Sequence, residues 1–196
     1  MLNKNITLTF IRFSRCLILL ASIILSPTAS VADEEAKITI DTATLSLQEQ
    51  TFLLSANIHY SLSDEAIEAL HNGVTLTFNV DLSMIELRNW LWNKRHSSIT
   101  LRYQIRYHTL AEIYQISDVT HNSQHNFATL TAALHALGKL RELPMHYIAA
   151  PNGYSAHGSI SAYLNIEALP LPMRPQAYIT PGWNLRSDSF QWPLNP

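Results

Sequence analysis

The feature that most constrains the fold of this chain is a strict two-residue alternation of apolar and polar side chains. It is clearest in "GVTLTFNVDLS" (73–83) and "ITLRYQIRYH" (99–108). Alternation over this length indicates antiparallel strands that bury one face and expose the other. The residues expected to face inward are Val74, Leu76, Phe78, Val80 and Leu82 in the first segment, and Ile99, Leu101, Tyr103, Ile105 and Tyr107 in the second.

Two further segments, "QTFLLSANIHY" (50–60) and "YSAHGSISAYLNI" (154–166), show the same alternation. Each strand with one apolar face needs a second layer of structure to cover that face. The sequence therefore predicts a mainly β fold, an antiparallel two-layer β-sandwich that is immunoglobulin-like in general architecture. No internal repeat or linker is visible, so residues 33–196 are expected to form a single domain.

Two short helices are expected between these strands. The segment "SDEAIEALHNG" (63–73) offers Ser63 as an N-cap, acidic residues in the first turn and Gly73 as a terminating glycine. The segment "NFATLTAALHALG" (126–138) repeats apolar residues at helical spacing and ends in a glycine. Because both helices are short, we expect them to close an end or an edge of the sandwich.

The C-terminal part of the chain is rich in proline, as in "ALPLPMRPQAYITPGW" (168–183). Proline lacks an amide donor and is disfavoured in central strands and in the interior of helices. We therefore expect this tail to run along the domain as an edge segment, held in place by Trp183, Phe190 and Trp192.

The N-terminal residues have the layout of a secretory signal. Lys4, Arg12 and Arg15 precede the apolar run "CLILLASIIL" (16–25), and small residues lead up to Ala32. This order of basic, apolar and small residues predicts a signal peptide over residues 1–32 and a periplasmic mature protein. The alternative is an uncleaved N-terminal segment that anchors the protein to the inner membrane. The apolar run is short for a membrane span, which requires about 20 residues.

The charge and cysteine content of the mature chain exclude several classes of protein. After position 32 the sequence has ten basic and fifteen acidic residues, which gives a net charge of about −5 with histidine neutral. An acidic domain is a poor ligand for nucleic acid, whose phosphates require basic excess. No second apolar run remains to span a membrane. The single cysteine, Cys16, would leave with the signal, so no disulfide stabilises the mature chain.

The segment "RNWLWNK" (88–94) follows a break in the alternation. Apolar residues occupy even positions up to Met84 and odd positions from Ile85, which predicts a bulge or bend that would carry the chain to the opposite sheet. Trp90 and Trp92 share one face of the continuing strand. They are expected to pack at the edge of the sandwich. The functional alternative is an aromatic platform for a sugar or a peptide.

Strand alternation places Arg102, Gln104, Arg106 and His108 on one side of a strand, opposite its apolar residues. One interpretation is the solvated face of a sheet, in which arginines pair with neighbouring acids. The other is a docking surface for an acidic partner or a lipid headgroup, since arginine presents a planar fork of donors. The candidate partner-binding residues are Arg102, Arg106, His108, Trp90 and Trp92.

Catalytic and metal-binding motifs are missing from the sequence. It contains no G-x-S-x-G, H-E-x-x-H, P-loop or G-x-G-x-x-G pattern. His121 and His125 have the spacing of zinc ligands on a helix, but the polar segment "SDVTHNSQHN" (117–126) favours a hairpin tip. We therefore predict a non-enzymatic protein without catalytic residues, metal or cofactor. A hydrolase is the third possibility, after an interaction module and a module that binds a small ligand or glycan through the Trp90/Trp92 strand.

Several segments in this order resemble one family. They are "GVTLTFNVDL", "RNWLWNK", "LRYQIRYHTLAEIYQI", "NFATLTAALHALGKLRELP" and "ALPLPMRPQAYITPGWNLRSDSFQWPL", which together span most of residues 38–193. The chain resembles the DUF4390 proteins, exported proteobacterial proteins of uncharacterised function. The resemblance implies an envelope-signalling setting, because such proteins are often encoded near a membrane histidine kinase of the nitrogen-regulation type. The expected partner is that kinase or another envelope protein.

Overall fold

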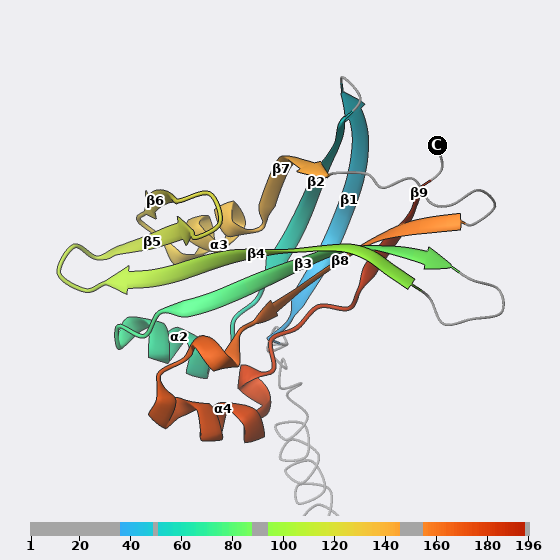
Figure 1. Cartoon of the computed structure of the whole chain (residues 1–196). Coiled ribbons are helices and arrows are strands. Elements are labelled where there is room, and N and C mark those ends of the chain that lie inside the picture. The colour runs from blue at the N-terminus through green and yellow to red at the C-terminus, as the bar shows by residue number, and fades with distance from the viewer. Residues whose placement is uncertain (1–35, 49–50, 88–93, 146–154, 195–196) are drawn as a thin grey trace, which may run out of the picture. The chain divides into compact units, whose positions relative to one another are not determined.

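The computed structural model describes residues 36–48, 51–87, 94–145 and 155–194, which belong to one compact unit, Glu34–Pro196. Its strands form two antiparallel sheets, a small one in the order β1-β2-β7 and a large one in the order β6-β5-β4-β3-β8-β9 (Figure 1). The strands are β1 (Ile38–Gln48), β2 (Thr51–Tyr60), β3 (Leu76–Leu87), β4 (Lys94–His108), β5 (Ile113–Asp118), β6 (Ser123–Phe127), β7 (Lys139–Met145), β8 (Ser155–Leu164) and β9 (Phe190–Leu194). The predicted signal peptide, residues 1–32, lies outside the described residues.

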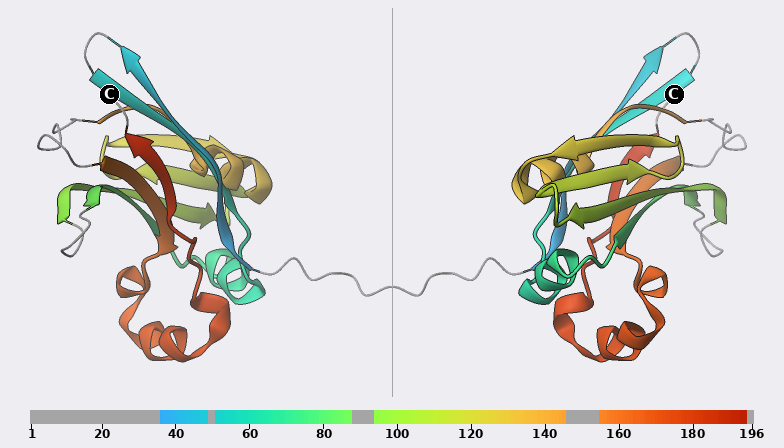
Figure 2. Two further views of the ribbon diagram at one scale, coloured as in Figure 1. Left: turned by 90° about the vertical axis from the view of Figure 1, so that its right-hand side faces the viewer. Right: turned by 90° about the vertical axis from the view of Figure 1, so that its left-hand side faces the viewer.

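The two sheets share one hydrophobic core, which confirms the predicted antiparallel two-layer fold. The alternation places its apolar residues inside, with Phe78 of β3 and Ile105 of β4 at 0% exposure. Tyr60 of β2 meets Phe78 edge to face, with 5.1 Å between the ring centroids, so the sheets are in direct contact. The strands of the small sheet run steeply across β4 and β5 (Figure 2).

A bulge interrupts the pairing of β3 with β4 where the sequence predicts one. Met84 lies opposite Ser97 and Ile85 lies opposite Arg95, so His96 is the extra residue and belongs to β4. The expectation that the chain changes sheets at this point is wrong, because β3 continues beside β8 as far as Leu87. An extra residue on the partner strand absorbs the change of register, and no crossover is needed.

Two of the helices, α2 (Asp64–His71) and α3 (Leu130–Leu137), are those that the sequence predicts. The hydroxyl of Ser63 accepts a hydrogen bond from the amide of Ala66, and Gly73 adopts a left-handed φ of 84° just after α2. The second helix begins later than expected, at a Thr129 cap, because Phe127 ends β6. Both helices contribute buried residues to the shared core.

Gly138, directly after α3, is required by a close approach of two backbones. Its carbonyl accepts a hydrogen bond from the amide of Ile58 in β2, at 2.8 Å. A Cβ at position 138 would lie only 1.8 Å from the carbonyl oxygen of Ile58. This contact attaches the end of α3 to the small sheet and fixes the start of β7.

The proline-rich tail forms another α-helix, α4 (Arg174–Ile179), so the described residues contain three short α-helices where two were expected. Its proline, Pro175, stands at the start of the helix, where an amide donor is not needed. Three 3₁₀ turns accompany it: η1 (Ile166–Ala168), η2 (Leu171–Met173) and η3 (Pro181–Trp183). The tail ends as expected in an edge strand, β9, with Trp183 and Trp192 buried.

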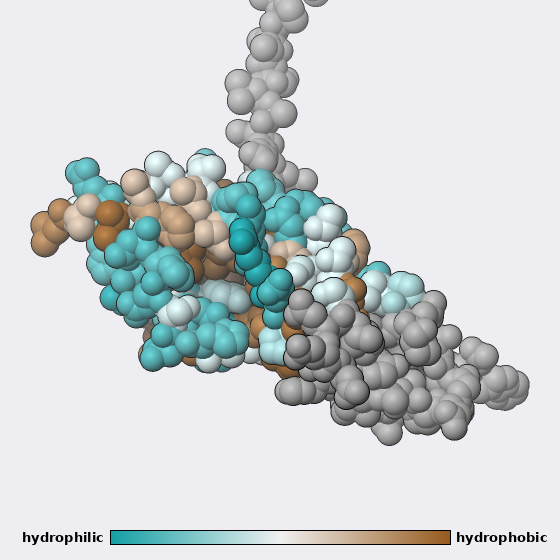
Figure 3. All heavy atoms as spheres, turned by 90° about the horizontal axis from the view of Figure 1, so that it is seen from above, coloured by the Kyte–Doolittle hydropathy of each residue, from teal (hydrophilic) through white to brown (hydrophobic). Residues whose placement is uncertain are grey.

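The surface of the described residues is mixed in character. Seen from above (Figure 3), hydrophobic residues gather at one end and along one edge, and hydrophilic residues cover much of the rest. The most exposed apolar side chains are Leu110, Ile179 and Leu171, on the turn after β4, on α4 and on η2. Single exposed apolar residues are common on folded proteins and by themselves indicate no site. In the described ranges, no helix has the length and apolar content needed to cross a bilayer.

Candidate functional site

The side of the large sheet that faces away from the shared core carries the predicted polar stripe. We call this side, with the outward-facing residues of β3, β4, β5 and β8, the outer face. On β4, Arg102 and Arg106 are exposed, while Gln104 and His108 are half-buried between neighbouring strands. Their immediate neighbours, such as Leu101 and Ile105, are buried on the opposite side. The structure thus brings Arg102, Arg106 and His108 together on one surface.

Hydrogen bonds between strands orient two members of the stripe. The guanidinium of Arg106 donates from Nε to the hydroxyl of Thr75, at 3.0 Å. The imidazole Nε2 of His108 lies 3.2 Å from Oε1 of Gln115 on β5. Thr75 is a neutral residue, so its hydrogen bond does not neutralise the charge of Arg106. One interpretation of the sequence pairs the arginines with acids on a neighbouring strand. Arg106 instead forms a hydrogen bond with a threonine.

Arg102 is held through its backbone and leaves its side chain free. Its amide donates to the hydroxyl of Thr120 at 3.1 Å, and its carbonyl accepts from the amide of Val119 at 2.9 Å. Its guanidinium makes no hydrogen bond or ion pair with any residue that the structure describes. An exposed guanidinium with all its donors available is well suited to a bidentate contact with a carboxylate.

A third arginine, Arg186, joins the outer face from the C-terminal tail. It bridges to Tyr163 at the edge of β8, and its guanidinium carbon lies 5.6 Å from the centroid of the Tyr163 ring. The Tyr163 hydroxyl in turn accepts a hydrogen bond from Nδ2 of Asn79 on β3, at 3.2 Å. Asn79 lies opposite Arg102 in the β3–β4 pairing. These four residues form one row across the sheet.

The sequence did not reveal Arg186 or Asn79 as members of the site. Arg186 is 84 positions from Arg102 in the chain, and only the pairing of the tail with β8 brings them to one surface. Asn79 stands at an outward position of β3 but is only 6% exposed, since larger side chains flank it. Its Oδ1 has no hydrogen-bond partner among the described residues. The alternation of β3 was the one available signal for Asn79.

The outer face is locally basic on an acidic domain. Among the described outward positions of its four strands, Asp81 is the one acidic residue, and it accepts a hydrogen bond from Thr100 at 2.6 Å. The tail that supplies Arg186 also carries an exposed acid, Asp188, which lies 4.0 Å from Lys37. The strands carry Arg102 and Arg106 against Asp81, and Arg186 lies beside them, while residues 33–196 as a whole carry a net charge of about −5. A local positive surface of this kind favours negatively charged ligands at short range.

Two other pairs of residues were candidates from the sequence, the tryptophans Trp90 and Trp92 and the histidines His121 and His125. Trp90 and Trp92 lie outside the described residues, so an aromatic platform stays a prediction. His121 and His125 occupy a hairpin, as predicted, with His121 in the turn after β5 and His125 on β6. In the described part of the chain, no three His, Cys, Asp or Glu residues come close enough to hold a metal ion.

The fold and this surface define a class of protein: a two-sheet, mainly β domain with exposed arginines on the outer face of its large sheet. A family model described as "Domain of unknown function (DUF4390)" matches residues 35–193. The chain therefore belongs to the DUF4390 family, in agreement with the resemblance seen in its sequence. No curated protein and no solved structure matches the chain.

Proposed function

We propose that this protein is a non-enzymatic binding module of the cell envelope, which docks an acidic segment of another envelope protein on its outer face. The observation that carries the proposal is the pair of exposed arginines on β4, Arg102 and Arg106, neither of which has an acidic partner among the described residues; Arg186 of the tail lies at the end of the same row. The first partner to test is the periplasmic part of a membrane histidine kinase, because the family resemblance suggests a signalling setting.

The geometry of β4 supports this choice of partner. Side chains four residues apart on a strand lie about 13 Å apart, so Arg102 and Arg106 can contact two carboxylates of one extended segment. Both guanidinium groups lack an acidic partner among the described residues, so binding would break no existing ion pair. Where such a hydrogen-bonded charge pair becomes buried on binding, truncating one partner typically costs roughly 2–5 kcal/mol of binding free energy.

The proposed location is the periplasm, and it is supported by the signal pattern of residues 1–32. If the signal is cleaved after Ala32, mass spectrometry of the envelope fraction will find a chain that begins at Asp33. A chain that retains its N-terminus and stays with the inner membrane would support the anchored alternative instead.

The test is affinity capture from native envelope extract with tagged mature protein. The double variant Arg102→Glu/Arg106→Glu reverses both charges on β4. We expect it to lose capture by roughly 100-fold or more, because two close charge pairs become repulsive. Its melting temperature should change little, since both side chains are exposed.

A matched control is the double variant Lys139→Glu/Arg141→Glu. Both of these residues are exposed on β7 of the small sheet, so the control changes the net charge equally and leaves the outer face intact. Capture by the control should equal that of the wild type at each salt concentration. Equal loss in both double variants would mean that net charge matters and the outer face does not, and would refute the proposal.

A further inference from the structure

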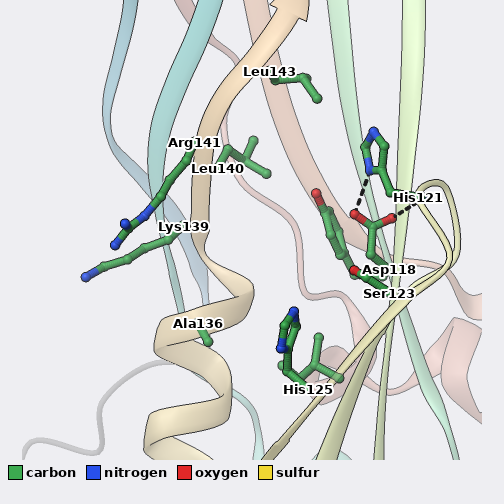
Figure 4. A pocket seen from close by; sticks show the side chains of 11 residues that line it. Asp118, His121, Ser123, His125, Ala136, Lys139, Leu140, Arg141 and Leu143 are labelled. Carbon is green, nitrogen blue, oxygen red and sulfur yellow. Dashed lines mark hydrogen bonds and ion pairs between the residues drawn. The ribbon is translucent and has the colours of Figure 1, made fainter.

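A pocket of about 310 Å³ lies where the edges of the two sheets come near each other. It is lined by β4, β5 and the β5–β6 hairpin on the side of the large sheet, and by α3 and β7 on the other side (Figure 4). Its volume is at the lower end of the range of roughly 300–1,000 Å³ that ligand pockets occupy. It lies on the core side of the large sheet, so it is separate from the outer face.

One wall of this pocket is apolar. Leu140 and Leu143 of β7 point across the pocket toward the hairpin, and Ala136 of α3 lies below them (Figure 4). Lys139 and Arg141 of β7 also contribute to the lining, but their charged ends extend to the other side of the strand (Figure 4). A bulge between Leu140 and Leu143, where Glu142 has a φ of 49°, puts both leucines on the interior side of β7 although they are three residues apart.

The opposite wall carries polar groups, and one of them, the carboxylate of Asp118, is already engaged in hydrogen bonds within the hairpin. The carboxylate of Asp118 accepts hydrogen bonds from the amides of Thr120 and His121, both at 2.9 Å, and from Nδ1 of His121 at 2.7 Å. These three bonds stabilise the turn between β5 and β6. Asp118 therefore contributes a negative charge to the pocket but offers a ligand few free lone pairs.

Tyr103 of β4 provides a hydrogen-bond donor on this wall, which Ser123 and His125 of the hairpin also line. It lines the pocket, and its hydroxyl has no hydrogen-bond partner among the described residues. Burial, together with the nearby Asp118 carboxylate, raises the pKa of Tyr103 to about 12. The hydroxyl consequently remains protonated near neutral pH and can donate to a ligand.

We propose that this pocket binds a small neutral molecule with an apolar body and one hydrogen-bond acceptor, such as the carbonyl of an ester or an amide. The leucines accept the apolar body, and the hydroxyl of Tyr103 donates to the acceptor. An anion is disfavoured, because Asp118 faces the pocket while the charged ends of Lys139 and Arg141 extend to the other side of β7 (Figure 4). A cation is disfavoured because His121 already pairs with Asp118.

The test uses four benzene derivatives of similar size: methyl benzoate, benzoate, benzylammonium and toluene. Each is titrated into isotopically labelled protein without the predicted signal, which retains the whole compact unit Glu34–Pro196. We expect saturable amide shifts around Ile116, Leu140 and Leu143 with methyl benzoate. Toluene should bind more weakly, and the two ions should bind least.

Two variants locate the ligand within the pocket. Tyr103→Phe should weaken the affinity for methyl benzoate by roughly fivefold, which corresponds to the loss of one ordinary hydrogen bond. It should leave the affinity for toluene unchanged. Ala136→Phe should fill the space and weaken the binding of both ligands by more than tenfold. Thr131→Phe, at an exposed position on another face of the same helix, should weaken the binding of neither.

Nuclear Overhauser contacts between methyl benzoate and the methyl groups of Leu140 and Leu143 provide a measurement that needs no variant, should Ala136→Phe fail to fold. The proposal fails if methyl benzoate gives no saturable shifts or no such contacts. It also fails if benzoate binds as tightly as the ester, or if Tyr103→Phe weakens toluene and methyl benzoate equally. The last result would show that Tyr103 only shapes the wall.

Discussion

The two sides of β4 differ in what their residues do, although they alternate along one strand. On the core side, Leu101 and Ile105 are at most 1% exposed and pack in the shared hydrophobic core. On the outer face, Arg102 and Arg106 are exposed; the side chain of Arg106 donates a hydrogen bond to the neutral Thr75, and that of Arg102 has no partner among the described residues. Folding determinants and proposed binding determinants are therefore adjacent in sequence yet separate in space. Single substitutions can distinguish the two.

The largest difference is expected between Ile105→Ala and Arg106→Ala. Ile105 is completely buried, so removing its side chain leaves a cavity and should lower the free energy of unfolding by about 2–5 kcal/mol. Arg106 loses one exposed hydrogen bond to Thr75, so its substitution should cost about 0.5 kcal/mol or less. Urea denaturation followed by circular dichroism measures both.

If the two substitutions cost the same, the contrast between the faces of β4 would be wrong in one of two ways. A large effect of Arg106→Ala would make the stripe a structural element, and would remove the support for a docking surface. A small effect of Ile105→Ala would mean that the two sheets do not share a close-packed core at this position.

A smaller effect concerns a core tyrosine at alkaline pH. Burial is the main cause that raises the pKa of Tyr60 well above its ordinary value of 10.0. The folded state then keeps the phenol proton to a higher pH than the unfolded state does. Titration of this group therefore leaves the free energy of unfolding unchanged below pH 10 and lowers it as the pH rises above 10. The fall is at most about 1.4 kcal/mol per pH unit, because one group is titrated.

Tyr60→Phe removes this titration. Its free energy of unfolding should decline less steeply above pH 10 than that of the wild type. At neutral pH the free energy of unfolding of the variant should be close to that of the wild type or higher. The reason is that the Tyr60 hydroxyl is buried with no hydrogen-bond partner among the described residues. Urea denaturation at a series of pH values tests this expectation, and parallel curves for the two proteins would contradict it.

The strands with strict alternation were the most predictable part of this molecule. A period of two specifies which side of a strand is apolar, and only one register buries that side, so Phe78 and Ile105 could be assigned to the core without coordinates. The caps of α2 were equally accessible, because Ser63 and Gly73 meet local requirements of the backbone.

The proline tail and the pocket show where such reasoning ends. Helix α4 was missed because a proline excludes the interior of a helix but fits its first turn, and the sequence does not say which applies. The pocket combines Tyr103, Asp118 and Leu143 from separate elements of both sheets. Its position depends on how the sheets pack, which no local pattern specifies. The row of Arg102, Asn79, Tyr163 and Arg186 depends in the same way on long-range strand pairing.

The smallest predicted effect on stability sharpens the comparison most, since it concerns a buried residue of the outer face. Asn79 is 6% exposed, and its Oδ1 has no hydrogen-bond partner in the described part of the chain. Burying an unsatisfied carbonyl is unfavourable, while valine is well suited to a strand. Asn79→Val should therefore raise the free energy of unfolding, by less than about 1 kcal/mol.

The same substitution should weaken capture of the acidic partner. Without the Asn79 amide, the hydroxyl of Tyr163 loses the donor that orients it, and the ring beneath Arg186 is free to move. Ser83→Ala, at a buried position of β3 four residues from Asn79 and away from the arginines, is the control, and it should leave capture unchanged. A gain in stability together with a loss of capture would indicate that the outer face retains an unfavourable group for binding. A loss of stability with unaltered capture would instead make Asn79 a purely structural residue, and the row across the sheet would no longer support a binding site.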